Sequence, residues 1–177
     1  LIELYQKTIG LVGLSKIGLA CAKIYKAMGI EVIAYNRSRH KEAEAYVEYV
    51  DLEELYQRAD IVDLHLPLTE KTRNIIDKKA FDQMKDGVII INSARGKLID
   101  EDALIEALDS GKVFAAGLDV VRKEPIRDDN PLLKYDNVII TPHMARGPRE
   151  TRQRLLDIAA ENFKGFLDGK NINTVKA

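Results

Sequence analysis

The stretch Thr8-Ile9-Gly10-Leu11-Val12-Gly13-Leu14-Ser15-Lys16-Ile17-Gly18 joins an apolar run to an amphipathic segment, so it predicts a strand that turns directly into a helix. The spacing of its glycines is typical of a dinucleotide-binding turn, in which Gly13 permits the tight turn and Gly18 lets the helix pack on the strand. Ser15 occupies the middle position, where its side chain narrows the approach of a pyrophosphate. By itself the altered motif fits a tight turn without any ligand equally well.

Strand-like runs alternate with helical periodicity along the rest of the chain. This alternation predicts an α/β fold, a Rossmann-type doubly wound parallel sheet with helices on both faces. A last helix near 148–167 has an apolar stripe at helical spacing, which we interpret as facing the core rather than a partner. The stripe consists of Leu155, Ile158, Ala159, Phe163 and Phe166. Strands are expected near 8–13, 31–35, 47–50, 61–66, 87–92, 113–119 and 137–141, and the earlier helices near 16–28, 39–46, 51–58, 74–84 and 100–110.

Length and composition predict one well-cored domain over residues 1–177, because 46% of the residues are apolar and 31% are charged. With 27 basic and 28 acidic residues, the net charge is −1, so the chain creates no positive electrostatic potential that would attract nucleic acid or an anionic membrane. No apolar run is long enough to span a bilayer and Leu1 does not open a signal peptide, so we expect a cytoplasmic protein. Cys21, the single cysteine, is interpreted as a small buried residue, and the sequence shows no metal-ligand spacing and no disulfide framework.

Polar residues follow the predicted strands at the ends where open α/β sheets bind their ligands. Because the carboxyl ends of parallel strands lie on one edge, we expect these residues to gather in one region. They are Asn36-Arg37-Ser38-Arg39, His65-Leu66-Pro67-Leu68-Thr69, Asn92-Ser93-Ala94-Arg95-Gly96, Asp119 with Glu124-Pro125, and Thr141-Pro142-His143.

At these residues the chain resembles the D-isomer-specific 2-hydroxyacid dehydrogenases, which include glyoxylate/hydroxypyruvate reductases, 3-phosphoglycerate dehydrogenase, and formate and phosphite dehydrogenases. The matching blocks follow the order of that family and cover nearly the whole chain. The resemblance implies that Arg95, Glu124 and His143 occupy the catalytic positions. It also implies cofactor contacts at Lys16, Ile17, Leu66, Ala94 and Asp119, besides the turn residues Gly13, Ser15 and Gly18. The blocks are His65-Leu66-Pro67-Leu68-Thr69 with Thr72, Ile91-Asn92-Ser93-Ala94-Arg95-Gly96 with Asp100-Glu101 and Leu104, Leu118-Asp119-Val120 with Glu124-Pro125, and Thr141-Pro142-His143.

The catalytic residue types suit the reduction of a small 2-oxo acid to a D-2-hydroxy acid by NAD(P)H. Arg95 offers a planar fork for the substrate carboxylate and a charge that polarises the carbonyl. Histidine exchanges protons near neutrality, so His143 can protonate the developing alkoxide while Glu124 orients it. Taken singly, each residue also fits a role without catalysis: Arg95 as a surface ion-pair partner, Glu124 as a solvated loop residue and His143 as a structural histidine. His65 stays open between lining the nucleotide site and capping a buried strand.

Two departures from the family pattern bear on the cofactor. Asn36 stands 18 residues after Gly18, where NAD-using members carry an acidic residue for the adenosine ribose. Because Asn36 is neutral and Arg37, Ser38 and Arg39 follow it, we expect NADP to be preferred to NAD, the alternative being that the arginines are solvated loop charges. The second departure is Arg146, in a stretch where the family usually places small residues near the nicotinamide.

Complete members of the family add a flavodoxin-like substrate domain across a cleft, and this chain carries none. The start at Leu1, shortly before the first strand, predicts the nucleotide-binding domain of a longer protein. The resemblance also implies a homodimer. Two other functions stay open, a formate- or phosphite-type dehydrogenase and a nucleotide-sensing protein of the corepressor kind, and turnover by the full-length protein separates them.

Overall fold

The structure is a computed structural model that describes residues 2–174. Its backbone divides into two compact units, Leu1–His143 and Met144–Ala177. The first unit holds the sheet and the residues predicted to be functional, and the second holds the last helix. None of the helices within the described part is long and apolar enough to cross a membrane.

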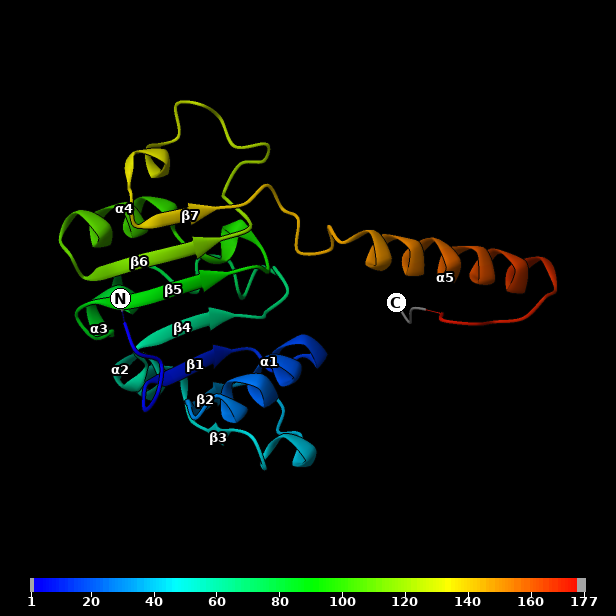
Figure 1. The fold of residues 1–177 in the computed structure, drawn as a ribbon, viewed down its shortest axis with the longest axis horizontal. Helices are drawn as coiled ribbons and strands as arrows, with labels where there is room; N and C mark the ends of the chain where they lie inside the picture. Colours follow the sequence, from blue (N-terminus) through cyan, green and yellow to red (C-terminus); the bar gives the residue numbers. More distant parts are fainter. Residues whose placement is uncertain (1, 175–177) are drawn as a thin grey trace. The chain divides into compact units, whose positions relative to one another are not determined.

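The first unit is built on a seven-stranded sheet with the order β3-β2-β1-β4-β5-β6-β7 (Figure 1). All neighbouring strands pair in parallel, so their carboxyl ends share one edge. The chain order reverses between β1 and β4, and ligands of such sheets bind at this switch point. The predicted Rossmann-type parallel sheet is therefore confirmed. The strands are β1 (Thr8–Val12), β2 (Glu31–Tyr35), β3 (Glu48–Tyr49), β4 (Ile61–Leu64), β5 (Val88–Asn92), β6 (Val113–Leu118) and β7 (Val138–Ile140).

Two predicted helices of the first unit are shorter than expected. The helix expected near 39–46 is a single 3-10 turn, because His40 provides no side-chain cap and so short a segment gains too few hydrogen bonds to offset helix nucleation. The helix expected from residue 74 begins only after Asp77, whose side chain caps it, because Ile76 pairs with Ile99 as a β-bridge. The helices are α1 (Lys16–Ala27), α2 (Leu52–Arg58), α3 (Lys78–Gln83), α4 (Glu101–Asp109) and α5 (Arg149–Leu167), with 3-10 turns η1 (Lys41–Ala43), η2 (Gly96–Leu98) and η3 (Pro131–Lys134).

The core forms on both faces of the sheet because successive strand residues point to opposite sides. One cluster of buried residues includes Leu11 of β1, Ala22 of α1 and Ile61 of β4, and most of its other members come from β1, β2 and the segments beside β2. The larger cluster on the other face joins Val12 to residues of the three helices α2, α3 and α4, such as Leu55 and Phe81. Full burial of a Leu or Phe side chain stabilises the fold by roughly 1.5–3 kcal/mol. These two clusters hold the carboxyl ends of the strands in register.

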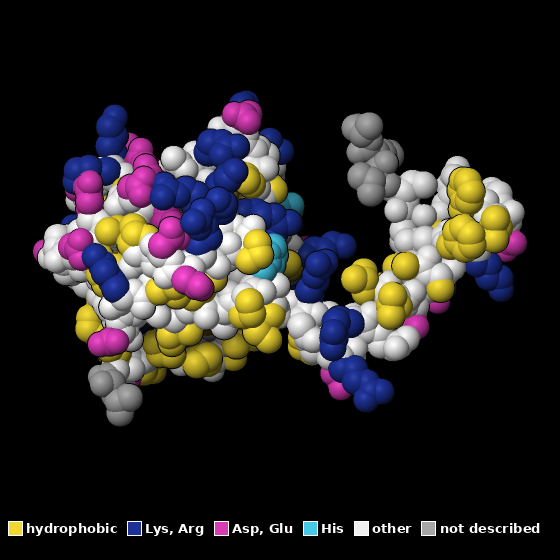
Figure 2. Space-filling view, turned by 90° about the horizontal axis from the view of Figure 1, so that it is seen from above, with side chains coloured by type: hydrophobic (Ala, Val, Ile, Leu, Met, Phe, Trp, Pro, Cys, Tyr) yellow, Lys and Arg dark blue, Asp and Glu magenta, His cyan; other side chains and the backbone are white. Residues whose placement is uncertain are grey.

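The apolar stripe of α5 does not face a core, which corrects the sequence interpretation. Figure 2 shows hydrophobic side chains on the surface of this last helix. Within its unit the helix packs on the turn that follows it, where a Cβ at Gly165 would lie 2.6 Å from Ile172 Cδ1. Helical spacing shows only that apolar residues share a face, and it does not reveal what covers that face. The exposed fractions are 54% for Leu155, 46% for Ile158, 64% for Phe163 and 77% for Phe166, and Ala159 is exposed as well.

Candidate cofactor and catalytic site

The turn between β1 and α1 depends on glycine at two positions. Gly13 has a φ of +97°, which L side chains rarely adopt, and a Cβ there would lie 2.7 Å from Leu66 Cδ2. A Cβ at Gly18 would lie 2.8 Å from the Gly13 carbonyl oxygen. The first turn of α1 therefore packs directly on the backbone of the loop, as the glycine spacing predicts.

Ser15 caps the helix that begins at this turn. Its Oγ accepts a hydrogen bond from the Gly18 backbone N–H at 3.3 Å, and its carbonyl accepts from Leu19. A serine directly before an amphipathic segment is a common N-cap signal, which the sequence interpretation overlooked in favour of its bulk. Lys16 and Ile17 follow on the exposed start of the helix, whose N-terminal end favours anions.

Asn36 connects this turn to the loop that follows β2. Its Oδ1 accepts from the Leu14 backbone N–H at 3.0 Å, and its Nδ2 donates to the Ser38 carbonyl at 2.7 Å. The side chain thus holds both loops, a role that no sequence signal showed. Arg37 is exposed, while the Arg39 guanidinium lies 5.5 Å from the centre of the Tyr49 ring.

A first cavity of about 540 Å³ opens beside the turn, at the ends of β4 and β5. Several of the predicted cofactor residues line it together with Arg95. Arg95 is exposed, and one of its guanidinium nitrogens donates to the Ala94 carbonyl at 2.6 Å. The cavity thus joins the glycine turn to the strand ends on the other side of the switch point. Its lining residues are Ser15, Ile17, His65, Leu66, Pro67, Leu68, Ser93, Ala94 and Arg95.

A second cavity of about 380 Å³ holds Glu124 and His143, which the structure brings together. His143 Nδ1 lies 2.7 Å from Glu124 Oε2, and the other carboxylate oxygen accepts from the Val121 N–H at 3.3 Å. His143 has a φ of +51°, an uncommon conformation that its N–H bond to the Asp119 carbonyl, 2.9 Å, helps to hold. With Nδ1 engaged by the carboxylate, Nε2 is the nitrogen left to exchange a proton.

Asp119 links the strand ends beneath this pair. Its carboxylate accepts a hydrogen bond from the Thr141 hydroxyl, so the loops after β6 and β7 are tied at the cavity. Of the predicted cofactor residues, Asp119 therefore lies with the predicted catalytic pair, whereas Leu66 and Ala94 lie in the first cavity.

Close backbone contact joins the loop of Arg95 to the loop of Glu124. A Cβ at Gly96 would lie 1.9 Å from the Val121 carbonyl oxygen, so only glycine fits where these loops meet. Arg95 thus stands one residue from this contact, and Glu124 is bonded to Val121. The three predicted catalytic residues follow the adjacent strands β5, β6 and β7, with Arg95 in the first cavity and the other two in the second.

Glu101, at the start of α4, braces the loop that carries Glu124. Its side chain is 7% exposed, and its two oxygens accept from the Arg122 N–H at 2.9 Å and from Asn130 Nδ2 at 3.2 Å. The sequence placed Glu101 in a family block but gave no sign of this contact across 21 residues.

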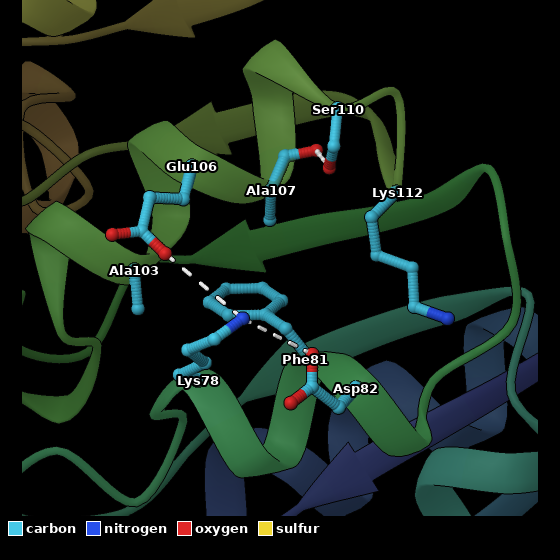
Figure 3. Close-up of a pocket in the computed structure, with 8 residues that line it drawn as sticks. All are labelled: Lys78, Phe81, Asp82, Ala103, Glu106, Ala107, Ser110 and Lys112. Atoms are coloured by element: carbon cyan, nitrogen blue, oxygen red, sulfur yellow. Dashed lines mark hydrogen bonds and ion pairs between the residues drawn. The ribbon is translucent and has the colours of Figure 1, made fainter.

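A third cavity, of about 400 Å³, lies between α3 and α4 (Figure 3). Its charges are met within the chain, since Lys78 pairs with Asp82 and Glu106, and Lys112 pairs with Asp86. Lys112 stands just before β6, at the opposite edge of the sheet from the strand ends that carry the predicted site. This cavity takes no part in the candidate site.

A parallel sheet with a glycine turn at its switch point defines the class of dinucleotide-binding domains. A sequence model described as "D-isomer specific 2-hydroxyacid dehydrogenase, NAD binding domain" matches residues 1–145. The chain belongs to this family, as the resemblance predicted. Its first unit is the NAD-binding domain of the family.

Relatives and solved structures agree with this assignment. The chain is 49% identical over 176 residues to a hydroxypyruvate reductase of Blautia hydrogenotrophica, which covers 99% of the chain and 55% of the relative. It is 42% identical over 170 residues to a glyoxylate reductase of Korarchaeum cryptofilum, covering 95% and 51%. The structure of a D-lactate dehydrogenase with NAD⁺ from Lactobacillus jensenii superposes with a TM-score of 0.93 at 37% identity, over 99% of this chain and 57% of that one. The chain thus spans about half the length of the curated relatives it matches.

Proposed function

We propose that this chain forms the nucleotide-binding half of an oxidoreductase that transfers a hydride between NAD(P)H and a small 2-oxo acid, giving a D-2-hydroxy acid. The observation that carries the proposal is the His143–Glu124 pair, held at 2.7 Å on the same sheet edge as the glycine turn. The names of the relatives, hydroxypyruvate reductase and glyoxylate reductase, support this substrate class.

In the proposed reaction the three residues have separate tasks. Arg95 binds the substrate carboxylate through its guanidinium fork and draws electron density from the carbonyl. His143 Nε2 gives its proton to the developing alkoxide, and in the reverse direction it takes the hydroxyl proton. Glu124 holds Nδ1 and stabilises the charged imidazole before transfer. A nicotinamide, when bound, would supply the hydride to C2 of the substrate, or would accept it in the oxidation.

The first test is a substrate panel on the full-length enzyme with both cofactors. We expect turnover of glyoxylate or hydroxypyruvate, and its loss in His143→Gln. Turnover of formate or phosphite instead would establish the other dehydrogenase class, which the names of the relatives do not favour. Cofactor binding without turnover of any of these compounds would support a nucleotide-sensing protein and contradict the proposal.

We further propose that the enzyme prefers NADP(H) to NAD(H). Asn36 places a neutral amide after β2, and the exposed Arg37 stands next to it. One charge-assisted hydrogen bond contributes roughly 1.5–3 kcal/mol, so a single well-formed contact to a 2′-phosphate gives about tenfold tighter binding or more. Titration of both cofactors tests this. Equal affinities, or a preference for NAD(H) that persists in Asn36→Asp and Arg37→Ala, would leave the arginines as surface charges.

The 177 residues are proposed to act as one dinucleotide-binding part of a two-part enzyme. We therefore expect the chain alone to bind dinucleotide but to show negligible turnover, because substrate positioning and water exclusion need the other cleft wall. Equal turnover per site by the chain and the full-length enzyme would contradict this. The homodimer remains a prediction from the family resemblance and the cytoplasmic location a prediction from the sequence pattern, and light scattering and cell fractionation test them.

A further inference from the structure

Three potential metal ligands from α1 and β4 converge beneath the glycine turn. Cys21, Asp63 and His65 each present one ligand atom, and these atoms lie within 4.8 Å of one another. Asp63 lies in β4 and His65 directly follows it, two residues on, so both side chains lie on the same side of the extended backbone. Helix α1 brings the thiol of Cys21 close to them. The fold creates this cluster, because Cys21 is far from Asp63 and His65 in sequence and the three residues form no metal-ligand spacing.

The carboxylate of Asp63 is buried and only half satisfied. Its side chain is 3% exposed, and Oδ2 accepts from the Tyr25 hydroxyl at 2.9 Å and lies 3.0 Å from His65 Nε2. Oδ1 is buried and has no hydrogen-bond partner among the described residues. A buried carboxylate oxygen without a hydrogen-bond partner is energetically unfavourable, and a bound cation or a hydrogen-bond donor would relieve this cost. The contact with His65 explains Oδ2 but leaves Oδ1 unexplained.

We propose that this cluster is a binding site for a zinc-like divalent cation, coordinated by Cys21 Sγ, Asp63 Oδ1 and His65 Nε2. Thiolate, imidazole and carboxylate together form a donor set that suits zinc, with bonds of about 2.0–2.3 Å. Such bonds place tetrahedral ligand atoms about 3.3–3.6 Å apart, so the cluster closes by about an ångström on binding. A water completes the fourth position.

Metal binding changes the protonation of the thiol. Burial and the neighbouring Asp63 charge raise the pKa of Cys21, so without metal the sulfur keeps its proton at neutral pH. The cation takes the place of this proton, which is released to solvent. Burial and Asp63 likewise raise the pKa of Tyr25, whose phenol stays protonated and continues to donate to Oδ2.

The site lies outside the proposed acid/base pair and has a structural consequence. A Cβ at Gly18 would lie 3.4 Å from the His65 ring, so a cation on His65 would join α1 to β4 directly under the phosphate-binding turn. We expect the metal to stabilise the fold rather than to act on the substrate. The inference does not depend on the proposed dehydrogenase reaction.

Cobalt titration tests the site, because Cys21 is the one cysteine in the sequence and any thiolate-to-cobalt charge-transfer band must come from it. With the chain and Co²⁺ alone, we expect a saturable near-ultraviolet band at one ion per chain, which Zn²⁺ abolishes by displacement. The band should disappear in Cys21→Ser, and the affinity for Co²⁺ should fall at least tenfold in Asp63→Asn. His40→Asn is the matched control, because His40 is exposed and outside the cluster, and it should bind as the unchanged chain does.

A second measurement covers variants that fold poorly. Zn²⁺ should raise the melting temperature of the unchanged chain and of His40→Asn, and should slow alkylation of Cys21 at least tenfold. No thiolate band at millimolar Co²⁺ would overturn the proposal, as would cobalt binding that His143→Gln removes. Unchanged alkylation of Cys21 in saturating Zn²⁺ would overturn it without using any variant.

Discussion

The glycine turn at β1 and the histidine–carboxylate pair at β6 and β7 lie on one edge of the same sheet, but they are specified in different ways. The turn depends on its backbone, since Gly13 and Gly18 leave no room for a side chain. The pair depends on two side chains that are 43% and 36% exposed, for His143 and Glu124. The contrast teaches that the shape of the glycine turn is fixed by its backbone, whereas the proposed acid/base pair rests on contacts between loops whose side chains remain open to solvent.

The largest effect is expected where side chains carry the chemistry. His143→Gln should lower kcat of the full-length enzyme by roughly 10²–10⁴, the usual contribution of a general acid–base, and leave cofactor affinity nearly unchanged. Steady-state kinetics and titration with the reduced cofactor measure the two quantities separately. A loss of kcat below about tenfold would mean that another group supplies the proton.

At the turn, Gly18→Ala should act on binding and stability instead. The added methyl would lie 2.8 Å from the Gly13 carbonyl oxygen, a backbone atom that cannot yield without moving the loop. We expect the free energy of unfolding to fall by about 1–3 kcal/mol and the cofactor Kd to rise about tenfold. Urea titration and cofactor titration measure these changes.

Gly117→Ala is the matched control for that substitution, because a Cβ at this strand position meets nothing within 4 Å. It should leave both quantities close to those of the unchanged chain. Equal effects of the two substitutions would show that Gly18 is not held by its contact with the loop.

The brace behind the pair predicts a smaller, mixed effect. Glu101→Gln keeps one acceptor for two donors, the Arg122 N–H and Asn130 Nδ2, so one part-buried donor loses its partner. We expect the free energy of unfolding to drop by about 1–3 kcal/mol, with a few-fold loss of kcat as the Glu124 loop loosens. Asp102→Asn provides the comparison, because it affects an exposed ion pair with Arg122 and should cost less than about 1 kcal/mol. Equal losses of stability in both variants would show that the hydrogen bonds of Glu101 do not hold the Glu124 loop.

The smallest expected effect is at the helix cap. Ser15→Ala removes the acceptor of the Gly18 N–H and should lower the free energy of unfolding by about 1 kcal/mol, whereas Ser15→Gly should cost only a few tenths. Urea titration of both variants distinguishes them. Equal stability of Ser15→Ala and the unchanged chain would show that the serine is not acting as a cap.

The sequence predicted the strands and their polar ends because these follow from local periodicity and from the geometry of parallel sheets. Such patterns carry no information about partners from distant elements. The hydrogen bonds of the Asn36 amide to both neighbouring loops therefore gave no signal in the sequence, and Cys21 was interpreted as buried, although it is half-buried near Asp63. The stripe of α5 shows the same limit, because periodicity defines a face but not its neighbour.

The double hydrogen bond of Asn36 makes cofactor choice a coupled trait. The same amide holds the backbone of Leu14 in the glycine turn and of Ser38 in the loop that follows β2. Replacement by aspartate, the substitution that would favour NAD, keeps the acceptor but deletes the donor to Ser38. A change of cofactor preference, in evolution or by design, therefore has to restore the hydrogen bond to the Ser38 loop at the same time. We expect efficient changes of preference to combine a substitution at position 36 with a second one at 37–39.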